Sequence, residues 1–195
     1  MAQVVPNLST QKIKFTYQDY LLLPDDGKRY EIIEGEMYMT PSPSLRHQDI
    51  LRELFRKIDQ YVLENRLGVV YVAPCDVIFS DSNIVQPDLI YISKENRDII
   101  KKQNINGTPD LLIEITSPKT KKRDLVFKKR LYAKFGVEEY WIVYPDEEKI
   151  EVYCLGDSKL DLFLRTEKSD ILKSKVFANL KIKTSEVFRD SGEYF

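Results

Sequence analysis

The order of the predicted helices and strands is the feature that most constrains the fold of this chain. An amphipathic helix is predicted after Ser42, several apolar and β-branched segments follow it, and a second helix ends at Gly136 before two further strands. Strands gathered between two helices are typical of an α/β (α+β) fold with a mixed sheet, and not of a barrel that repeats one strand and one helix. The sequence therefore predicts a mixed sheet flanked by helices, with extra strands at both ends.

The first long helix has recognisable ends and one apolar face. Ser42 is expected to cap it, and Pro43 suits the first helical position, where a missing N–H group costs no hydrogen bond. Gly68 is the expected end of the helix. Apolar side chains recur at spacings of three and four residues on the face expected to pack on the sheet: Leu51, Leu54, Phe55, Ile58 and Val62.

The other segments are separated by turn residues. A short helix is predicted over 16–23 and the second long helix over 122–135. Strands are predicted over 30–33, 37–40, 69–72, 77–79, 89–92, 111–116, 139–144 and 149–155. A length of 195 residues favours one domain, 1–195, with a loose N-terminal arm at 1–14 and a C-terminal strand extension at 156–195.

The composition excludes several classes of protein. The chain has 30 basic and 31 acidic residues, and 43% of its residues are hydrophobic, which is typical of a globular and not of a disordered protein. No apolar run approaches the roughly 18 residues of a membrane helix, and the N-terminus lacks the apolar segment of a secretory signal. Cys75 and Cys154 stand outside any CxxC or zinc-type spacing, so we expect reduced thiols and a cytoplasmic protein without a membrane partner.

Two predicted strands carry a carboxylate where an apolar residue would be expected. Glu114 lies between Ile113 and Ile115, and a buried carboxylate is costly unless it is paired, protonated or bound to a cation. Asp88 begins a neighbouring strand, and two such acids would form an all-oxygen site suited to Mg²⁺ or Mn²⁺. Asp110 lies on the same strand as Glu114, about 13 Å away at about 3.3 Å per residue, so Asp88 is the better partner. The alternatives are that Asp88 caps its strand and that Glu114 forms a salt bridge or faces solvent.

The second long helix directs one lysine toward the sheet. At about 100° per residue, Lys128 points along the middle of the apolar stripe, with Asp124 one turn before it and Tyr132 one turn after it. The alternative is a lysine whose aliphatic stem covers apolar surface while its ammonium group reaches water. Near two carboxylates and a metal ion, an ammonium group can serve phosphodiester hydrolysis by orienting a water molecule or by neutralising charge on phosphate oxygens. The other basic residues of this helix are expected to face water: Arg123, Lys129, Arg130 and Lys134.

Positive charge is concentrated around the start of this helix. Between positions 119 and 134 there are eight basic residues and one acid, and such an excess attracts anions although the whole chain is nearly neutral. Four of these residues are expected to contact nucleic-acid phosphates without reading sequence: Lys119, Lys121, Lys122 and Arg123. The alternative is a solvated helix face.

The pattern of Pro87-Asp88, then Glu114-Ile115-Thr116, then Lys128, resembles the PD-(D/E)XK restriction-endonuclease-like superfamily. Other stretches resemble one branch of that superfamily, the Uma-two family of endonuclease-like proteins, over roughly residues 16–155. These stretches are 30–36, 41–44 followed by His47, 86–89, 112–120, the series Asp124, Lys128 and Tyr132 at intervals of four, and 137–143.

The resemblance implies a αβββαβ core and a divalent-metal-dependent endonuclease with DNA as the favoured substrate. It implies that Asp88 and Glu114 bind the metal ion, Mg²⁺ or Mn²⁺. The superfamily's usual lysine, two residues after the second acid, is Thr116 here. Lys128 matches the lysine that members of this branch supply from the following helix. Many nucleases of this kind act as pairs, so a homodimer is one expected assembly.

Two further residues fall at positions that would complete such a site. Glu34 would be an additional acid, and His47 would contact water or phosphate. The alternatives are a turn residue and a first-turn helix residue without a chemical role. The threonine at position 116 also leaves open a catalytically inactive nuclease-fold module that binds nucleic acid or a protein partner. A serine hydrolase is not supported, because the chain has neither a GxSxG motif nor a second histidine.

Overall fold

The structure is a computed structural model that describes residues 13–190 and 192, so most of the expected N-terminal arm lies outside the described residues. The helices are α1 (Tyr17–Leu21), α2 (Leu45–Asn65), the 3₁₀-helix η1 (Arg97–Ile99), the π-helix η2 (Arg123–Lys128), α3 (Lys129–Phe135) and α4 (Thr184–Val187). The strands are β1 (Arg29–Ile33), β2 (Glu36–Thr40), β3 (Gly68–Val72), β4 (Val77–Ser80), β5 (Asn83–Val85), β6 (Leu89–Ser93), β7 (Ile105–Asn106), β8 (Leu111–Ile115), β9 (Glu139–Tyr144), β10 (Lys149–Leu155), β11 (Leu160–Thr166), β12 (Ile171–Leu172) and β13 (Ile182–Lys183).

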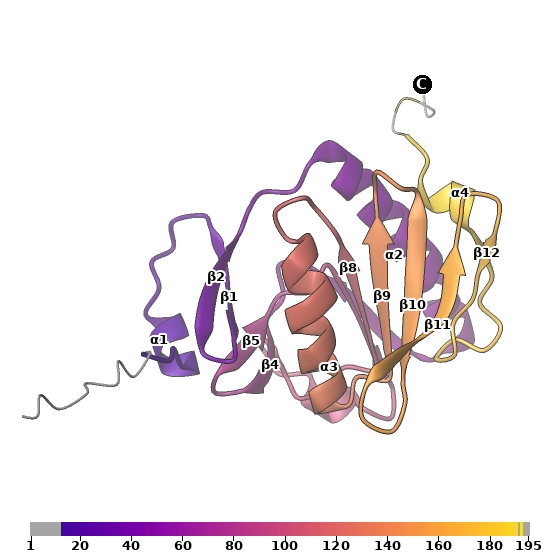
Figure 1. Ribbon diagram of the computed structural model, residues 1–195. Helices are drawn as coiled ribbons and strands as arrows, with labels where there is room; N and C mark the ends of the chain where they lie inside the picture. The colour runs from indigo at the N-terminus through magenta and orange to yellow at the C-terminus, as the bar shows by residue number, and fades with distance from the viewer. Residues whose placement is uncertain (1–12, 191, 193–195) are drawn as a thin grey trace, which may run out of the picture.

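The central sheet, in the order β11-β10-β9-β8-β6-β3, has α2 on one face and α3 on the other (Figure 1). Side chains alternate across it: Ile113 and Ile115 pack with α2, whereas Leu112 packs with Leu131 and Tyr132 of α3. β3, β6 and β8 are antiparallel neighbours, and β9 runs parallel to β8. Together with the two helices these strands form the expected αβββαβ core in a mixed sheet.

Helix α2 lies where it was expected, but both of its ends differ from the prediction. Ser44, and not Ser42, is the N-cap, because its hydroxyl accepts the backbone N–H of His47. At the other end Arg66 takes the left-handed conformation and caps the helix. Gly68 already belongs to β3, where an added Cβ would lie 2.1 Å from the carbonyl oxygen of Ile92. The close approach of two strands, and not the end of the helix, therefore requires this glycine.

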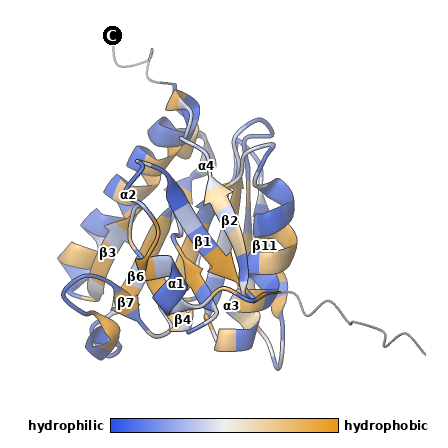
Figure 2. Cartoon of the chain, turned by 90° about the vertical axis from the view of Figure 1, so that its left-hand side faces the viewer, coloured by the Kyte–Doolittle hydropathy of each residue, from blue (hydrophilic) through white to orange (hydrophobic). Residues whose placement is uncertain are grey.

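A second sheet, in the order β2-β1-β5-β4-β7, lies beside the central one. Its β1–β2 hairpin is seen from the front in Figure 2, between α2 and α3. Glu34 and Gly35 form the two-residue turn of this hairpin, with φ of 54° and 80°, as a primed turn requires. The sequence predicts both hairpin strands. It does not predict β5 and β7, which are three and two residues long and too short to show a periodic pattern.

Beyond β10 the chain adds β11 to the edge of the central sheet, followed by β12, β13 and α4. The buried Glu139 of β9 binds this last segment through both carboxylate oxygens. Oε1 accepts Nε1–H of Trp141 and the hydroxyl of Ser174, both at 2.6 Å. Oε2 accepts the backbone N–H groups of Lys175 at 2.6 Å and Val176 at 3.2 Å. The thiol of Cys154 also donates to Oε2 at 3.7 Å, so five donors compensate the buried carboxylate.

Two expectations from composition can be compared with the described residues. None of the helices within 13–190 has the length and apolar character needed to cross a membrane. Cys75 and Cys154 are both free thiols, as expected from their isolated positions in the sequence.

Candidate active site

Asp88 and Glu114 are brought together by the pairing of β6 with β8. The antiparallel register pairs Leu89 with Ile113, so one residue further along it places Asp88 opposite Glu114. Both side chains are nearly buried, and Oδ2 of Asp88 accepts the backbone N–H of Ile115 at 2.8 Å. The two acids thus lie on adjacent strands at one end of the sheet, as expected.

Asp110, the competing acid, is engaged elsewhere. Its carboxylate accepts the backbone N–H of Ser93 at 2.8 Å and the hydroxyl of Ser93 at 3.0 Å. The side-chain amide of Asn96 also lies 3.2 Å from Oδ2. Asp110 therefore stabilises the turn after β6 and takes no part in the acidic pair.

The ammonium group of Lys128 lies within the same cluster of acids. Its Nζ is 2.7 Å from Oε1 of Glu114, 2.7 Å from Oε1 of Glu31 and 3.9 Å from Oδ1 of Asp124. Lys128 is only 1% exposed, so its ammonium group does not reach open solvent. An ammonium group has three N–H donors, and the two close carboxylates leave one of them for another acceptor.

The acids around Lys128 differ in how well their charge is compensated. Burial alone would lower the pKa of Lys128, but Glu114, Glu31 and Asp124 raise it above its usual value, so the lysine stays charged. Burial opposes ionisation of Glu31 as well, yet Lys128 and Arg123 hold its pKa below the usual value. The pKa of Glu114 is instead raised well above its usual value, by burial and by the neighbouring carboxylates, although Lys128 opposes the shift. Burial and the neighbouring carboxylates therefore disfavour the charged form of Glu114, which a bound cation would favour.

Arg123 does not face water, so this sequence prediction is wrong. It is 8% exposed, its NH1 lies 3.3 Å from Oε2 of Glu31, and its NH2 donates to Oγ1 of Thr40 at 3.3 Å. The reason is that residues 123–128 form a π-helix, in which hydrogen bonds join residues five apart. The wider turn rotates Arg123 toward the same side as Lys128, whereas the regular α-helix assumed for the prediction would have turned it to solvent.

Glu34 does not lie at the site, and Glu31 takes the place expected for it. Glu34 is exposed in the hairpin turn, where its Oε2 lies 2.8 Å from NH2 of Arg130. Glu31 is fully buried, contacts Lys128 and Arg123, and accepts the backbone N–H of Gln86 at 2.9 Å. A signal was present in the sequence, because Glu31 interrupts a predicted strand just as Glu114 does.

His47 and Tyr132 hold the two paired acids in place. Nε2 of His47 lies 3.1 Å from Oδ2 of Asp88, and the hydroxyl of Tyr132 donates to Oε1 of Glu114 at 2.8 Å. Burial raises the pKa of Tyr132 well above its usual value, so its hydroxyl remains a donor. Oδ1 of Asp88 and Oε2 of Glu114 accept no hydrogen bond from residues 13–190. One oxygen of each acid is therefore available to a ligand.

The lysines of the predicted phosphate-binding cluster differ in their contacts. Lys119 is exposed and lines the pocket described below, and Lys122 is also exposed. Lys121 forms an ion pair with Glu147, with Nζ 2.9 Å from Oε1. Thr116, which replaces the usual lysine of the superfamily, donates its hydroxyl to the carbonyl of Val143 at 3.0 Å. Thr116 therefore has a structural role between β8 and β9.

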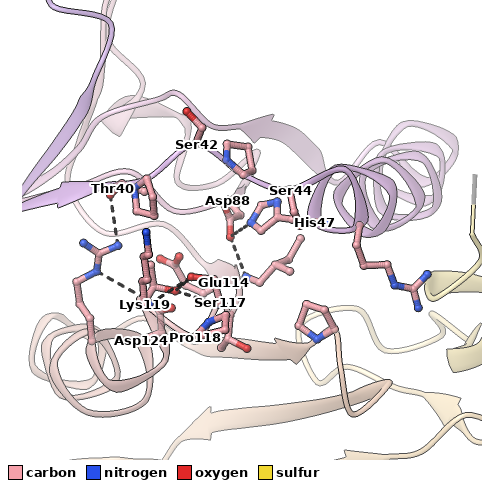
Figure 3. Close-up of a pocket in the computed structure, with 18 of the residues that line it drawn as sticks. Thr40, Ser42, Ser44, His47, Asp88, Glu114, Ser117, Pro118, Lys119 and Asp124 are labelled. Atoms are coloured by element: carbon pink, nitrogen blue, oxygen red, sulfur yellow. Dashed lines mark hydrogen bonds and ion pairs between the residues drawn. The ribbon is translucent and has the colours of Figure 1, made fainter.

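The acids and Lys128 line a pocket of about 340 Å³ (Figure 3). One wall is the segment 40–44, which joins β2 to α2, and the opposite wall is the turn 117–120 after β8. Figure 3 shows Asp88 and Glu114 between these walls, with His47 beside Asp88. The two free carboxylate oxygens therefore lie where a ligand can reach them from solvent.

The donor set fits a magnesium-type ion better than a zinc-type ion. Among residues 13–190, no group of three or more His, Cys, Asp or Glu side chains is arranged to hold a metal ion. Structural and catalytic zinc sites use three or four protein ligands. Mg²⁺ is usually bound through one or two carboxylates and keeps several water molecules. The free oxygens of Asp88 and Glu114 match this second case.

The αβββαβ core, two acids on adjacent strands and a buried lysine from the following helix define a restriction-endonuclease-like protein of the PD-(D/E)XK type. A family model named Uma2 and described as "Putative restriction endonuclease" matches residues 17–185, and the chain belongs to this family. It is the Uma-two family that the sequence motifs resemble.

The search of solved structures supports the same fold. The chain is similar to a crystal structure described as a "putative nuclease belonging to DUF820 from Anabaena variabilis ATCC 29413", with a TM-score of 0.74 and 23% sequence identity. The similarity covers 89% of this chain and 97% of that chain. No curated protein matches. The family and the fold together support a nuclease.

Proposed function

We propose that this protein is a divalent-metal-dependent endonuclease that hydrolyses phosphodiester bonds, with DNA as its substrate. The observation that carries the proposal is the buried ammonium group of Lys128, held 2.7 Å from Glu114 beside a pocket that also exposes one oxygen of Asp88. A fixed cation beside two acids that share a pocket is an arrangement that stabilises charge developing on a phosphate.

Each residue has a distinct role in this proposal. Asp88 and Glu114 hold Mg²⁺ or Mn²⁺ through their free oxygens, and the ion, when bound, polarises the phosphate and lowers the pKa of a bound water molecule. Lys128 donates its third N–H to the attacking water or to a phosphate oxygen. Glu31 fixes the direction of this lysine, and His47 fixes the carboxylate of Asp88.

The test is cleavage of supercoiled plasmid DNA with Mg²⁺ or Mn²⁺, combined with calorimetric titration of the metal ion. Asp88→Asn and Glu114→Gln should each abolish nicking and metal binding. Asp110→Asn is the matched control, because this acid directly precedes β8, the strand of Glu114, but stabilises a turn. Nicking that is equal in wild type and Asp88→Asn would show a contaminating nuclease and contradict the proposal.

The same experiment addresses the alternative of an inactive module. A wild-type protein that binds DNA but neither cleaves any tested substrate nor binds Mg²⁺ or Mn²⁺ would favour that alternative. Metal binding that disappears in Glu114→Gln would exclude it.

A further inference from the structure

The basic side chains that line the pocket fall into two groups. Three have fixed partners: Lys128 with Glu31 and Glu114, Arg123 with Glu31 and Thr40, and Arg46 with Glu148 and the backbone oxygens of Phe188 and Arg189. The other two, Arg29 and Lys119, have no hydrogen bond, ion pair or ring contact with any residue of the described part of the chain. Judged by the contacts within residues 13–190, these two pocket cations are the ones free to bind an anion without breaking a contact of the protein.

Arg29 is directed to the pocket by the alternation of side chains along β1. Glu31, two residues further on, points from the same face of the strand to Lys128. The hairpin register pairs Arg29 with Thr40, which also lines the pocket and contacts Arg123. The start of β1 therefore places a partly buried guanidinium on the hairpin side of the pocket.

Lys119 comes from the opposite wall. Its turn is fixed by hydrogen bonds between Ser117 and Thr120: the backbone N–H of Ser117 donates to Oγ1 of Thr120 at 3.1 Å, and the backbone N–H of Thr120 donates to Oγ of Ser117 at 3.3 Å. Figure 3 shows this turn facing the segment 40–44 across the pocket. The two free cations thus come from two different parts of the chain that line the pocket, the start of the hairpin and the turn after β8.

We infer that Arg29 and Lys119 bind phosphates adjacent to the scissile phosphate of a nucleic-acid strand. The inference rests on the proposed function and specifies its substrate as a continuous polyanionic strand, not a mononucleotide or a small phosphate ester. The acids of the pocket repel a phosphodiester, so free cations in the same pocket are needed to attract the strand to them. A planar guanidinium can bind a phosphate through two hydrogen bonds, and a lysine binds it as a point charge.

The inference also implies binding without sequence preference. Both cations act on the phosphate backbone, which carries no sequence information. Such contacts contribute a salt-dependent affinity, because each neutralised phosphate releases counterions. The slope of log Kd against log salt concentration therefore reports how many cations contact phosphates.

The experiment measures binding of a short fluorescein-labelled DNA, single-stranded and duplex, by fluorescence anisotropy with Ca²⁺ in place of Mg²⁺. Arg29→Gln and Lys119→Gln should each weaken binding about tenfold and reduce the slope of log Kd against log salt concentration by about 1. Arg97→Gln and Lys102→Gln remove the same charges from exposed positions outside the pocket and should leave both quantities unchanged.

The outcomes separate this inference from the proposed function. If the wild type cleaves no substrate but Arg29→Gln and Lys119→Gln still weaken binding, the nuclease proposal fails and the phosphate site stands. If these two variants bind as the wild type does, or if the wild type binds neither DNA, the phosphate site is overturned. Binding of a mononucleotide as tight as that of the oligonucleotide would overturn the continuous-strand specificity.

Discussion

Nζ of Lys128 lies 2.7 Å from Oε1 of Glu31, a residue of the second sheet, and this ion pair joins the β1–β2 hairpin to the π-helix. The pair is fully buried, and Arg123 of the same helix shares Glu31. The hairpin therefore does more than extend the sheet, because it supplies the carboxylate that fixes the proposed catalytic lysine.

Replacing Glu31 should destabilise the protein strongly. Glu31→Ala leaves two buried cations with less compensation, and removal of one partner of a buried ion pair costs about 3–5 kcal/mol. Unfolding in urea, followed by circular dichroism, measures this free energy. Glu34→Ala is the matched control from the same hairpin, because the exposed pair of Glu34 with Arg130 is worth at most about 1 kcal/mol. Equal losses in the two variants would contradict the buried network.

Replacing Lys128 should separate catalysis from metal binding. Lys128→Met removes a donor that acts on the reacting phosphate or water, and the loss of one such donor lowers kcat by about 10²- to 10³-fold. Metal affinity should not fall, since the variant removes a positive charge beside the acids. Lys134→Met, exposed on the same helical segment, is the control. Single-turnover cleavage at a temperature where both variants are folded is the measurement, and an unchanged rate in Lys128→Met would refute the role.

Replacing His47 should weaken metal binding while leaving the ligands in place. His47 contacts Asp88 through Nε2, and loss of a group that orients a metal ligand lowers affinity by about 10- to 100-fold. Calorimetric titration of His47→Ala with Mn²⁺ tests this expectation. Gln48→Ala changes the adjacent, exposed residue of α2 and should bind the ion as the wild type does. Similar affinities in the two variants would show that His47 does not orient Asp88.

Replacing Glu139 should loosen the end of the chain. In Glu139→Gln an amide NH₂ group faces N–H donors, and an unsatisfied buried polar group costs about 1–3 kcal/mol. Hydrogen exchange should become faster in residues 174–176, whose backbone and side-chain donors this carboxylate binds. Glu138→Gln, at the adjacent exposed position, should change neither stability nor exchange. An unaltered rate of hydrogen exchange in Glu139→Gln would contradict this prediction.

Replacing a core residue of α2 tests the predicted apolar face. Ile58 is fully buried against the central sheet, so Ile58→Ala should lower the free energy of unfolding by about 2–5 kcal/mol. Leu63 lies on the outer face of the same helix and is 64% exposed. Leu63→Ala should therefore change the free energy of unfolding by less than about 0.5 kcal/mol. Thermal or urea unfolding of the two variants gives the comparison.

Much of the site follows from local anomalies in the sequence. Glu114 interrupts an apolar strand, and Lys128 interrupts an apolar helical stripe, so burial alone requires each to find an oppositely charged partner. Strand geometry also excludes Asp110 as the second acid. These conclusions depend on the side-chain periods of strands and helices, which the sequence displays directly.

The sequence determined the order of a helix, several strands, a second helix and further strands, together with the hairpin and the presence of charged residues in apolar segments. Periodic patterns and turn residues are local properties of a chain. The tertiary structure decided which charges meet. It placed Glu31 and not Glu34 beside Lys128, turned Arg123 inward through a π-helix, and paired β4 with β5 in a second sheet. These outcomes depend on the energy of pairing buried charges between distant segments, and no local pattern contains that energy.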